Sequence, residues 1–482
     1  MGDISNYIPN ELFKIAQQIC TEVNSRAYLV GGAVRDAFLD IRCIDFDIEI
    51  YNIPLDKLLK RLSHYGKIHA VGKSFGVIKL ISPTGMNYDF SLPRIDSKSS
   101  QGHKGFEIKC DPTLSPMDAA SRRDFTINAL MYDLKKRQLL DFYGGLNDLN
   151  NKILRHIGKS FSDDPLRVLR GMQFAGRFSL HPAPETVAIC RENFSTYNEL
   201  SLDRIRDEWL KWATQSKSPS LGILFLESTN WIQAYPEIYI LRKCPQDPIW
   251  HPEGDVLTHT LMACDNLVQQ TDWKTLDFQT RASLLFAMLC HDFGKPDTLS
   301  YEIKNGIKRI HAKGHNMAGT SHIRNFLASI ALPIVMQKRI IPLVVNHMFD
   351  FENTAVTSSA IRRLSVRLQP ENIQDLARIN FADKTARGHV NPMSFSEWKQ
   401  KTKYVFNLAQ ELNVIQKSPS PILDGNIIMD ETGLPQGPHI GFIIKKAFNA
   451  QLDGKFNDIS SGIKWLKKNL KNLNYENTKN QK

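Results

Sequence analysis

Short apolar runs alternate with helical patterns over about the first 150 residues of the chain. Runs rich in β-branched and aromatic residues lie at residues 28–30, 44–50, 77–81, 88–92 and 138–142. Amphipathic stretches with helical periodicity separate these runs. Strands interleaved with helices are typical of an α/β or α+β unit, so we predict a mixed α/β head here.

From residue 163 onward the apolar positions follow a helical period, as in Leu166, Leu169 and Met172, with a basic opposite face. Almost no strand signal follows, so the remainder should be mostly α, within a multidomain α+β chain. Pro-rich segments at residues 244–255 and 418–426 mark plausible boundaries. We predict four parts: a head at 1–150, a helical neck at 151–244, a helical body at 245–415 and a small helical tail at 416–482.

Composition favours a globular protein, and its charge is compatible with a polyanionic partner such as nucleic acid. Of 482 residues 42% are hydrophobic, and 61 Lys and Arg against 50 Asp and Glu give a net charge of +11. The seven cysteines form no C-x-x-C pair, which indicates reduced thiols and a cytoplasmic location. The N-terminal residues lack a secretion signal, and Pro333, Lys338, Arg339 and Pro342 interrupt the most apolar stretch, so we expect no membrane span.

A candidate phosphate site follows the first predicted strand. Gly31 and Gly32 end that strand and begin a helical pattern that contains Arg35. Glycines let the backbone approach a ligand closely, and the amides of a following helix, with an arginine, can hold phosphate oxygens. A Gly-Gly turn is also a common structural feature, so this segment alone does not decide the function.

Three acidic residues form a candidate metal site. Asp45 and Asp47 are two residues apart in a β-rich run, so their carboxylates should point to one face, and Asp89 lies in a later strand. Carboxylates of like charge are tolerated when solvated at a strand end, or when a divalent cation such as Mg²⁺ neutralises them. Asp89 would complete the metal site or accept a proton from an attacking hydroxyl.

Five ordered motifs resemble those of class II tRNA nucleotidyltransferases, the CCA-adding enzymes. They read YLVGGAVRD, IDFDIEI, SRRDFTINAL, DFYGGLNDLNNKILR and DDPLRVLRGMQFAGRF, and lie between residues 28 and 178. The similarity extends to DGNIIMDETGLPQGPHIGFIIKKAFNAQLDGKF near the C-terminus. The resemblance implies template-independent addition of C, C and A to the 3′ end of tRNA from CTP and ATP. It also implies Mg²⁺ on Asp45 and Asp47, with Asp89 assisting.

The resemblance also assigns nucleotide-binding residues. It implies that phosphates and ribose are held by Gly31, Gly32, Arg35, Arg122, Arg123, Asp124 and Asn128, and that the base is read by Asp163, Asp164 and Arg167, with Arg170 nearby. A carboxylate that accepts from the exocyclic amine, beside a guanidinium that donates to the ring nitrogen, fits cytosine and adenine but not guanine or uracil. Asp164 and Arg167, three apart in a helical pattern, should share a helix face. Family members commonly carry Glu where this chain has Asp163.

Residues 94–120 are polar and contain Gly and Ser, so we predict a long functional loop. In the family the corresponding loop is linked to the switch from C to A addition, which argues against an enzyme that adds only CC.

A second group of residues suggests a transition-metal site. Asp255 and His259 are four apart, and the doublet of His291 and Asp292 ends an apolar helical pattern. These segments resemble an HD-type phosphohydrolase domain, which implies His259, His291, Asp292 and Asp383 as ligands of a metal such as Ni²⁺ or Mn²⁺, with His311, His315 and His347 as lesser candidates. His389 follows Asp383 in the same segment. The implied activities are phosphatase, 2′-nucleotidase and 2′,3′-cyclic phosphodiesterase. A structural role for the histidines is the alternative.

Two other functions stay open at this point. One is an A-adding enzyme or poly(A) polymerase of the same superfamily, although residues 71–77 resemble the CCA-adding version more closely. The other is an HD-type phosphohydrolase whose front domain only binds RNA. The Lys-rich segment at residues 463–482 is either a solvated helix face or an RNA contact. Oligomeric state and the rule that stops addition after one A stay undetermined.

Overall fold

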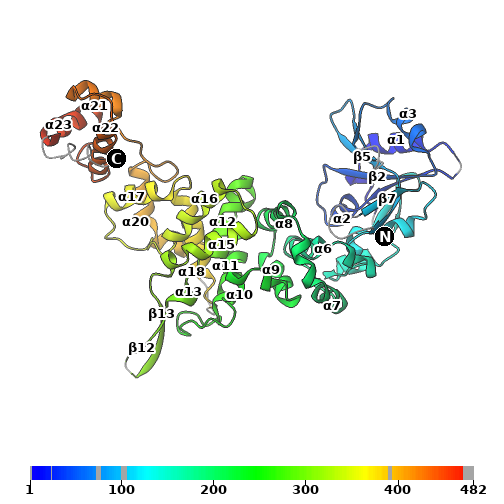
Figure 1. Ribbon diagram of the computed structural model, residues 1–482, viewed down its shortest axis with the longest axis horizontal. Helices are drawn as coiled ribbons and strands as arrows, with labels where there is room; N and C mark the ends of the chain where they lie inside the picture. Colours follow the sequence, from blue (N-terminus) through cyan, green and yellow to red (C-terminus); the bar gives the residue numbers. More distant parts are fainter. Residues whose placement is uncertain are drawn as a thin grey trace. The chain divides into compact units, whose positions relative to one another are not determined.

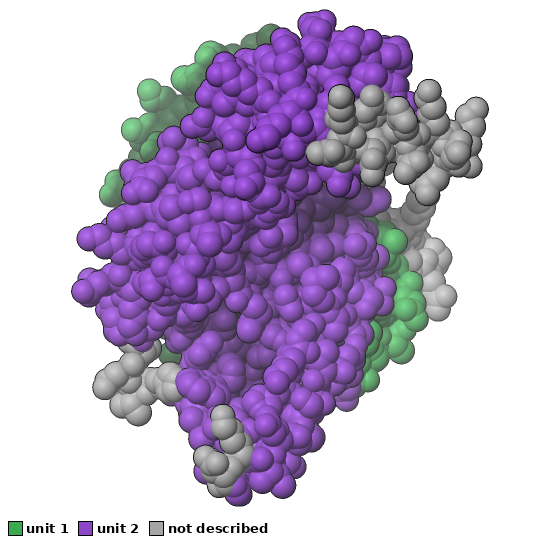
Figure 2. Space-filling view, turned by 90° about the vertical axis from the view of Figure 1, so that its left-hand side faces the viewer, with its two compact units in different colours: residues 1–236 green, residues 237–482 purple. Residues whose placement is uncertain are grey.

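The computed structural model describes residues 3–22, 24–71, 77–98, 106–304, 306–388 and 393–470. The chain divides into two compact units, residues 1–236 and 237–482, which have different colours in Figure 2. The four-part division suggested by the sequence stays a prediction. Residues 72–76 and 99–105, His389 and the C-terminal residues 471–482 carry parts of the predictions above and lie outside the described residues.

A seven-stranded sheet forms the centre of the head, in the order β3-β4-β5-β2-β1-β8-β9 (Figure 1). Strands β2 and β5 pair in parallel and all other neighbours are antiparallel. The strands are β1 (Arg26–Val30), β2 (Phe46–Tyr51), β3 (Lys67–Val71), β4 (Val77–Ile81), β5 (Asn87–Ser91), β8 (Met131–Asp133) and β9 (Gln138–Leu140). The predicted mixed α/β head is confirmed.

Alternation along β2 and β5 places apolar side chains on one face of the sheet and acidic side chains on the other, which also carries a smaller apolar cluster around Val30 and Met131. In β2, Phe46, Ile48 and Ile50 are buried in a core shared with helices α1 (Asn10–Ile19) and α3 (Leu55–Leu62). Because successive side chains point to opposite faces, Asp47 and Glu49 point the other way. That second face is where polar side chains of β2 and β5 gather.

Several predicted boundaries in the head were wrong. Strand β2 begins at Phe46, so Ile44, which is 73% exposed, and Asp45 precede it, and β9 ends at Leu140 rather than Phe142. The predicted loop at residues 94–120 contains an antiparallel pair and a short helix: β6 (Arg94–Lys98), β7 (Phe106–Cys110) and α4 (Pro116–Ser121). The polar character of this segment concealed its strands, because a pair outside the main sheet needs no continuous apolar run.

A bundle of helices completes the first unit. Its main helices are α2 (Gly32–Phe38), α5 (Gly145–Asn150), α6 (Leu166–Phe178), α7 (Pro184–Glu192), α8 (Leu202–Gln215) and α9 (Pro219–Ser228), and two short strands, β10 (Ile153–Leu154) and β11 (His181–Pro182), pair in parallel. Helix α6 packs closely on α8 and α9. Gly222 in α9 makes this possible, because a Cβ there would lie 2.7 Å from Trp212 Cδ1 and 2.8 Å from the Met172 carbonyl oxygen.

The second unit is mostly helical, as predicted. Helix α12 is buried from Ala282 through Cys290 and packs against α11, α16 and α18, so an apolar sequence without a polar face suits it. The helices are α10 (Pro236–Tyr239), α11 (Val256–Val268), α12 (Phe278–Cys290), α13 (Lys295–Thr298), α14 (His315–Ala318), α15 (Thr320–Ser329), α16 (Ile334–Asn346), α17 (Ser358–Leu368), α18 (Ile373–Thr385), α19 (Phe395–Lys401), α20 (Lys403–Glu411), α21 (Gly425–Thr432), α22 (Pro438–Leu452) and α23 (Ile459–Asn469).

A hairpin in the second unit was not predicted. Strands β12 (Leu299–Lys304) and β13 (Ile307–Ala312) pair antiparallel (Figure 1). The sequence between them, Asn305 and Gly306, is a strong two-residue turn signal, and Gly306 has φ of +74°. The hairpin was not predicted because it has no apolar face buried against a core; Tyr301 and Ile303 are exposed.

Helices α21, α22 and α23 share a small core of their own, which includes Ile428, Ile443 and Leu466. All seven cysteines are free thiols, as the sequence suggested. None of the described helices has both the length and the apolar character needed to cross a bilayer.

Replacement of Gly222 by Ala should destabilise the first unit. The added Cβ meets an indole ring and a backbone carbonyl that cannot move aside easily, so we expect a loss of about 1–3 kcal/mol of unfolding free energy. Gly441→Ala is the control, because nothing lies within 4 Å of a Cβ in that helix and the change should stabilise by about 0.5–1 kcal/mol. Thermal unfolding followed by tryptophan fluorescence measures both. An unchanged Gly222→Ala transition would mean that α6 and α9 do not pack this closely.

Candidate functional site

A cavity of about 1030 Å³ is lined by the polar face of the head sheet and by the following helices. All eleven predicted nucleotide-binding residues and Asp47 line it, whereas Asp45 and Asp89 do not. Among the described lining residues, eight arginines and one lysine stand against four aspartates. Such an excess of positive charge suits a triphosphate.

Asp47 and Asp89 are direct neighbours on strands β2 and β5. They are partners in the parallel register and therefore point to the same face. Desolvation raises the pKa of Asp47, and the negative charges of Asp89, Asp45 and Glu49 act in the same direction against the opposing charge of Arg123.

The surroundings of Asp89 also suit a cation. Its Oδ1 has no hydrogen-bond partner and lies 4.0 Å from Lys79 Nζ. Adjacent carboxylates of this kind fit Mg²⁺. Asp45, Asp47 and Asp89 nevertheless do not bring three ligand atoms within 4.8 Å of one another. Among the described residues, every group of three or more such atoms lies in the second unit.

Glu49, two residues beyond Asp47, was not identified from the sequence. It is 1% exposed and accepts hydrogen bonds from Arg122 (2.9 Å), Arg123 (3.1 Å) and the Tyr51 hydroxyl (2.9 Å). Burial favours its neutral form, but the charges of Arg123 and Arg122 outweigh burial and lower the pKa of Glu49. A buried anion therefore holds both arginines at the cavity wall. The alternating acids Asp45, Asp47 and Glu49 were the signal that could have revealed it.

The turn after β1 requires glycine at one position. Gly31 has φ of +71°, and a Cβ there would lie 2.7 Å from Nη1 of Arg123. At Gly32, by comparison, a Cβ would lie 3.4 Å from Arg35 Nη2. Gly31 thus lets the Arg123 guanidinium lie directly against the backbone.

Arg35 is buried and already has several partners. Its guanidinium donates to Asp36 Oδ1 (2.8 and 2.6 Å) and to Asn128 Oδ1, and lies 4.3 Å from the centre of the Phe178 ring. It lines the cavity at the same time. Its contacts fix the orientation of Asn128, so the structure gives Arg35 an internal role besides the predicted phosphate contact.

Asp124 is the centre of a second buried network. Its carboxylate accepts from Asn128 Nδ2 (2.9 Å), the Phe125 amide (2.8 Å) and Arg170 Nε (2.6 Å). Burial opposes ionisation, yet the charge of Arg170 and these hydrogen bonds together lower the pKa of Asp124. Asp124 therefore stays charged and joins the head to helix α6.

The predicted helix face shared by Asp164 and Arg167 was wrong. Helix α6 begins at Leu166, so Asp164 precedes it with extended backbone. Asp164 Oδ1 accepts from the Leu166 amide (3.1 Å), and Oδ2 accepts from Arg204 Nη2 (2.8 Å). Pro165 explains the boundary, because proline suits the first turn of a helix and restricts the residue before it. Arg204 was not identified from the sequence.

Arg167 and Asp163 lie at the same wall. Arg167 donates to the backbone carbonyls of Ser160 (2.8 Å) and Arg122 (2.6 Å), which leaves three of its five N–H groups for other partners. Asp163 ends a short 3-10 helix, Lys159–Asp163, and lines the cavity. A charged donor and a charged acceptor, Arg167 and Asp164, thus line one cavity.

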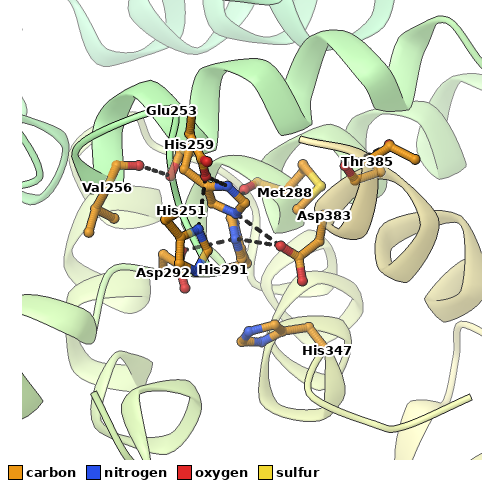
Figure 3. Close-up of polar contacts among 12 residues, drawn as sticks. His251, Glu253, Val256, His259, Met288, His291, Asp292, His347, Asp383 and Thr385 are labelled. Carbon is orange, nitrogen blue, oxygen red and sulfur yellow. Dashed lines mark hydrogen bonds and ion pairs between the residues drawn. The ribbon is translucent and has the colours of Figure 1, made fainter. Parts of the chain in front are cut away.

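A cluster of histidines and carboxylates lies in the second unit (Figure 3). His259, on α11, is fully buried; its Nε2 lies 2.9 Å from Asp383 Oδ1 on α18, and its Nδ1 lies 2.8 Å from Glu253 Oε1. His291, which follows α12, has its Nε2 4.0 Å from the same Asp383 oxygen. The four residues predicted as an HD-type ligand set are therefore close together.

Asp292 connects two groups of ligand atoms. One group is His259, His291 and Asp292, and the other is Asp292, His315 and His347. Asp292 Oδ2 lies 3.1 Å from His291 Nε2 and its Oδ1 3.2 Å from His315 Nε2, while the Nε2 atoms of His315 and His347 are 3.1 Å apart. Asp292, His315 and His347 line a cavity of about 500 Å³ together with Asp383.

The donor chemistry of this cluster fits a divalent transition metal. The nearby positive charges of His291 and Lys295 keep the pKa of Asp292 well below its usual range despite burial, and the hydrogen bond to His259 does the same for Asp383. Burial lowers the pKa of His347 to about 4, so its imidazole is neutral. Asp292 Oδ2 also pairs with Lys295 Nζ at 2.6 Å. Burial opposes protonation of His259, but its hydrogen bonds to Asp383 and Glu253 raise its pKa to about 9, so a metal would bind there in place of a proton. Ionised carboxylates and neutral imidazoles are the ligands such metals take.

Two other predicted neighbours have different roles. Asp255 caps α11 by accepting from the Thr258 amide (2.8 Å), so it is not a ligand. His311 pairs with Glu302 (3.2 Å) across the hairpin. Glu253, two residues before Asp255, is the carboxylate that contacts His259. Its position in the same short segment was the sequence signal that could have revealed it.

Comparison with known proteins agrees with the fold. The family model of the poly A polymerase head domain matches residues 27–155. Solved structures share the fold of nearly the whole chain: Bacillus stearothermophilus CCA-adding enzyme in complex with CTP (TM-score 0.62, 18% identity, 98% of this chain and 99% of that one) and Thermotoga maritima CCA-adding enzyme complexed with tRNA (TM-score 0.58, 18% identity, 97% and 99%).

Sequence relatives are more informative about the family. The multifunctional CCA protein of Tolumonas auensis is 32% identical over 361 residues, which cover 72% of this chain and 82% of that protein. That of Psychromonas ingrahamii is 36% identical over 313 residues, or 64% and 70%. The similarity extends far beyond the head that poly(A) polymerases share, and the chain therefore belongs to the multifunctional CCA protein family of CCA-adding nucleotidyltransferases.

Proposed function

We propose that the head cavity is the centre of nucleotidyl transfer, where C, C and A are added in turn to the 3′ end of tRNA from CTP and ATP. The observation that carries this assignment is the pairing of Asp47 with Asp89 in register beside a wall of arginines. Opposed negative and positive surfaces of this kind suit a metal-bound triphosphate.

The acidic side would hold Mg²⁺ through Asp45 and Asp47, with Asp89 assisting. When bound, Mg²⁺ neutralises phosphate charge and activates the 3′-hydroxyl for in-line attack. The basic side belongs to the chain itself: Glu49 orients Arg122 and Arg123 at the cavity wall, where both guanidinium groups would bind phosphate oxygens. Because these donors are fixed before the nucleotide arrives, little reorganisation is needed for binding.

Base selection would depend on Asp164 and Arg167. Asp164 is oriented by Arg204 and the start of α6, and Arg167 by two backbone carbonyls. Each keeps hydrogen-bonding capacity, so Asp164 would accept from an exocyclic amine and Arg167 would donate to a ring nitrogen. Uracil and guanine present the reverse pattern and would leave both groups unpaired.

Asp47→Asn should abolish incorporation of CMP and AMP while tRNA binding and the unfolding temperature stay unchanged. The amide keeps the size of the side chain but removes the charge that a cation needs. Labelled CTP and ATP with tRNA lacking its terminal CCA measure incorporation. Asp56→Asn, an exposed acid in α3, is the control and should retain full activity. Appreciable incorporation by Asp47→Asn would remove this residue from the mechanism.

Asp164→Ala should relax nucleotide selection more than it slows chemistry. Loss of the Asp164 carboxylate removes one acceptor from the paired base, which costs about 1–3 kcal/mol of discrimination. The preference for CTP over UTP, measured as the ratio of their kcat/KM values, should therefore fall by about 5- to 150-fold. Asp203→Ala is the control, because Asp203 is an exposed acid in α8 that pairs only with Arg206 among the described residues. An unchanged ratio would exclude Asp164 from base reading.

A second activity is favoured by the histidine cluster. We propose that His259, His291, Asp292 and Asp383 hold a divalent metal such as Ni²⁺ or Mn²⁺ and form an HD-type phosphohydrolase centre for 2′,3′-cyclic phosphates and other phosphate esters. Four ligands from three separate helices or their ends converge, and His259, His291 and Asp292 bring their ligand atoms within 4.8 Å of one another. When bound, such a metal polarises a phosphoryl oxygen and generates a nucleophile from water.

Glu253 acts in this centre as a positioning residue. Its bond to His259 Nδ1 leaves Nε2 directed at Asp383 and fixes the ring orientation, as carboxylates commonly do for metal-bound histidines. Gly388 supports the arrangement: its φ is +57°, and a Cβ there would lie 2.8 Å from Glu253 Cβ. Glu253 is thus held by close backbone packing at the end of α18.

Substitutions in the cluster should separate the two activities. His291→Ala should eliminate phosphodiesterase activity but spare incorporation, while Glu253→Gln should weaken Mn²⁺ binding by about 10- to 100-fold. Isothermal titration with Mn²⁺ gives a readout independent of turnover. His322→Ala, a histidine paired with Asp297 outside the cluster, is the control. Intact phosphodiesterase activity in His291→Ala would contradict the second centre, and unchanged Mn²⁺ affinity in Glu253→Gln would contradict only the positioning role.

A further inference from the structure

A third cavity lies in the second unit and is lined by residues other than those of either proposed centre. Its volume is about 910 Å³, and it is lined by α18, α19, α20 and the segment that follows α11 (Figure 1 labels α18 and α20). No described residue lining it also lines the histidine cavity or the head cavity. Pockets that hold small ligands have about this size.

One wall of the cavity is aromatic and rigid. Phe395 is 54% exposed, and its ring is stacked on Trp398 with centroids 5.9 Å apart and an interplanar angle of 21°. The ring of Phe381 packs against both of them, with its centroid 5.3 Å from that of Phe395 and 5.4 Å from that of Trp398. Trp398 is fixed in turn by donation from Nε1 to Asn380 Oδ1 at 3.2 Å. An exposed ring on a fixed aromatic base offers a free face for stacking.

The cavity rim is positively charged. Lys399, Lys403 and Lys417 line it, and none of them forms an ion pair with any described residue. The described lining contains one carboxylate, Asp272, and that group is neutralised by Arg378 at 2.6 and 3.0 Å. The three lysines are thus available to an anion.

Amide side chains complete the lining. The lining contains four amides that each carry donor and acceptor atoms: Gln374, Gln410, Asn407 and Asn413. The Gln374 amide oxygen already accepts from Gln416 Nε2 at 3.3 Å. Amides suit a planar heterocycle whose edge presents donors and acceptors together. An apolar ligand would leave them unpaired, whereas a nucleobase would satisfy them.

We propose that this cavity binds a nucleotide, with the base stacked on Phe395, its edge bonded to the amides, and the phosphate held by Lys399, Lys403 and Lys417. The combination of an aromatic platform with a positively charged rim is the chemistry by which unpaired nucleotides are bound. The nucleotide would come from an unpaired position of the RNA substrate or from a free mononucleotide. The RNA source rests on the proposed action on tRNA, whereas the mononucleotide source does not.

Binding of fluorescent tRNA lacking its terminal CCA to the full-length protein tests the RNA source. Phe395→Ala should weaken tRNA affinity by about 5- to 150-fold. Lys403→Glu should also weaken tRNA affinity, and its effect should be larger at low salt than at high salt. Incorporation of CMP at saturating tRNA should stay unchanged. Phe278→Ala removes an equally exposed phenylalanine, 50% exposed, outside the cavity and serves as the control. Should Phe395→Ala unfold, Lys403→Glu alone still gives the measurement.

Titration with AMP, CMP, GMP and UMP by calorimetry tests the free-nucleotide source. Both wild type and Phe395→Ala retain the head cavity, so one additional binding event in the wild type would identify this cavity. Unchanged tRNA affinity in both variants, together with identical mononucleotide titrations, overturns the proposal. A wild-type protein that fails to bind tRNA counts against the proposed function instead, and the mononucleotide titration then decides about the cavity.

Discussion

Burial of ionised carboxylates is the constraint on which both centres depend. Glu49 and Asp124 in the head, and Asp292 in the second unit, are charged and almost wholly enclosed. Removing such groups from water costs several kcal/mol each, so the fold must supply cations and donors at hydrogen-bond distance. The buried carboxylates serve to orient their partners rather than to stabilise the fold. They hold arginines, histidines and a lysine in fixed directions beside a cavity.

Regular backbone geometry turns this constraint into two shaped sites. In the head, the strand period sends Asp47 and Glu49 to the face opposite the apolar core, where the parallel register aligns Asp89. In the second unit, His291, His315 and His347 each use Nδ1 to bond a backbone carbonyl three residues earlier, at Met288, Ala312 and Val344. Because Nδ1 of each of these three histidines is bonded to the backbone, its Nε2 is the nitrogen left for the proposed metal ion.

The features that the sequence predicted correctly depend on short-range patterns. Alternation in β2 and the apolar run of α12 were sufficient to predict the head, the helical second unit and the neighbourhood of Asp47 and Asp292, and the family motifs supplied the remaining candidates. Some of the features it missed depend on contacts distant in sequence. Arg204 lies 40 residues from Asp164, and no local pattern indicates their ion pair. The β12–β13 hairpin and the β6–β7 pair escaped prediction because neither joins the main sheet.

Arg122 links the group proposed to read the base with the groups proposed to hold the phosphates. Its backbone carbonyl accepts from Arg167, and its side chain donates to Glu49, which also holds Arg123. A displacement of Arg122 therefore moves the partner that orients the Arg167 guanidinium. Since misplacement by about 1 Å is costly for a transfer reaction, a base that pairs poorly with Arg167 should also leave its triphosphate poorly aligned. Selection in such a site acts on the rate of transfer as well as on affinity, which is what an enzyme without a template needs.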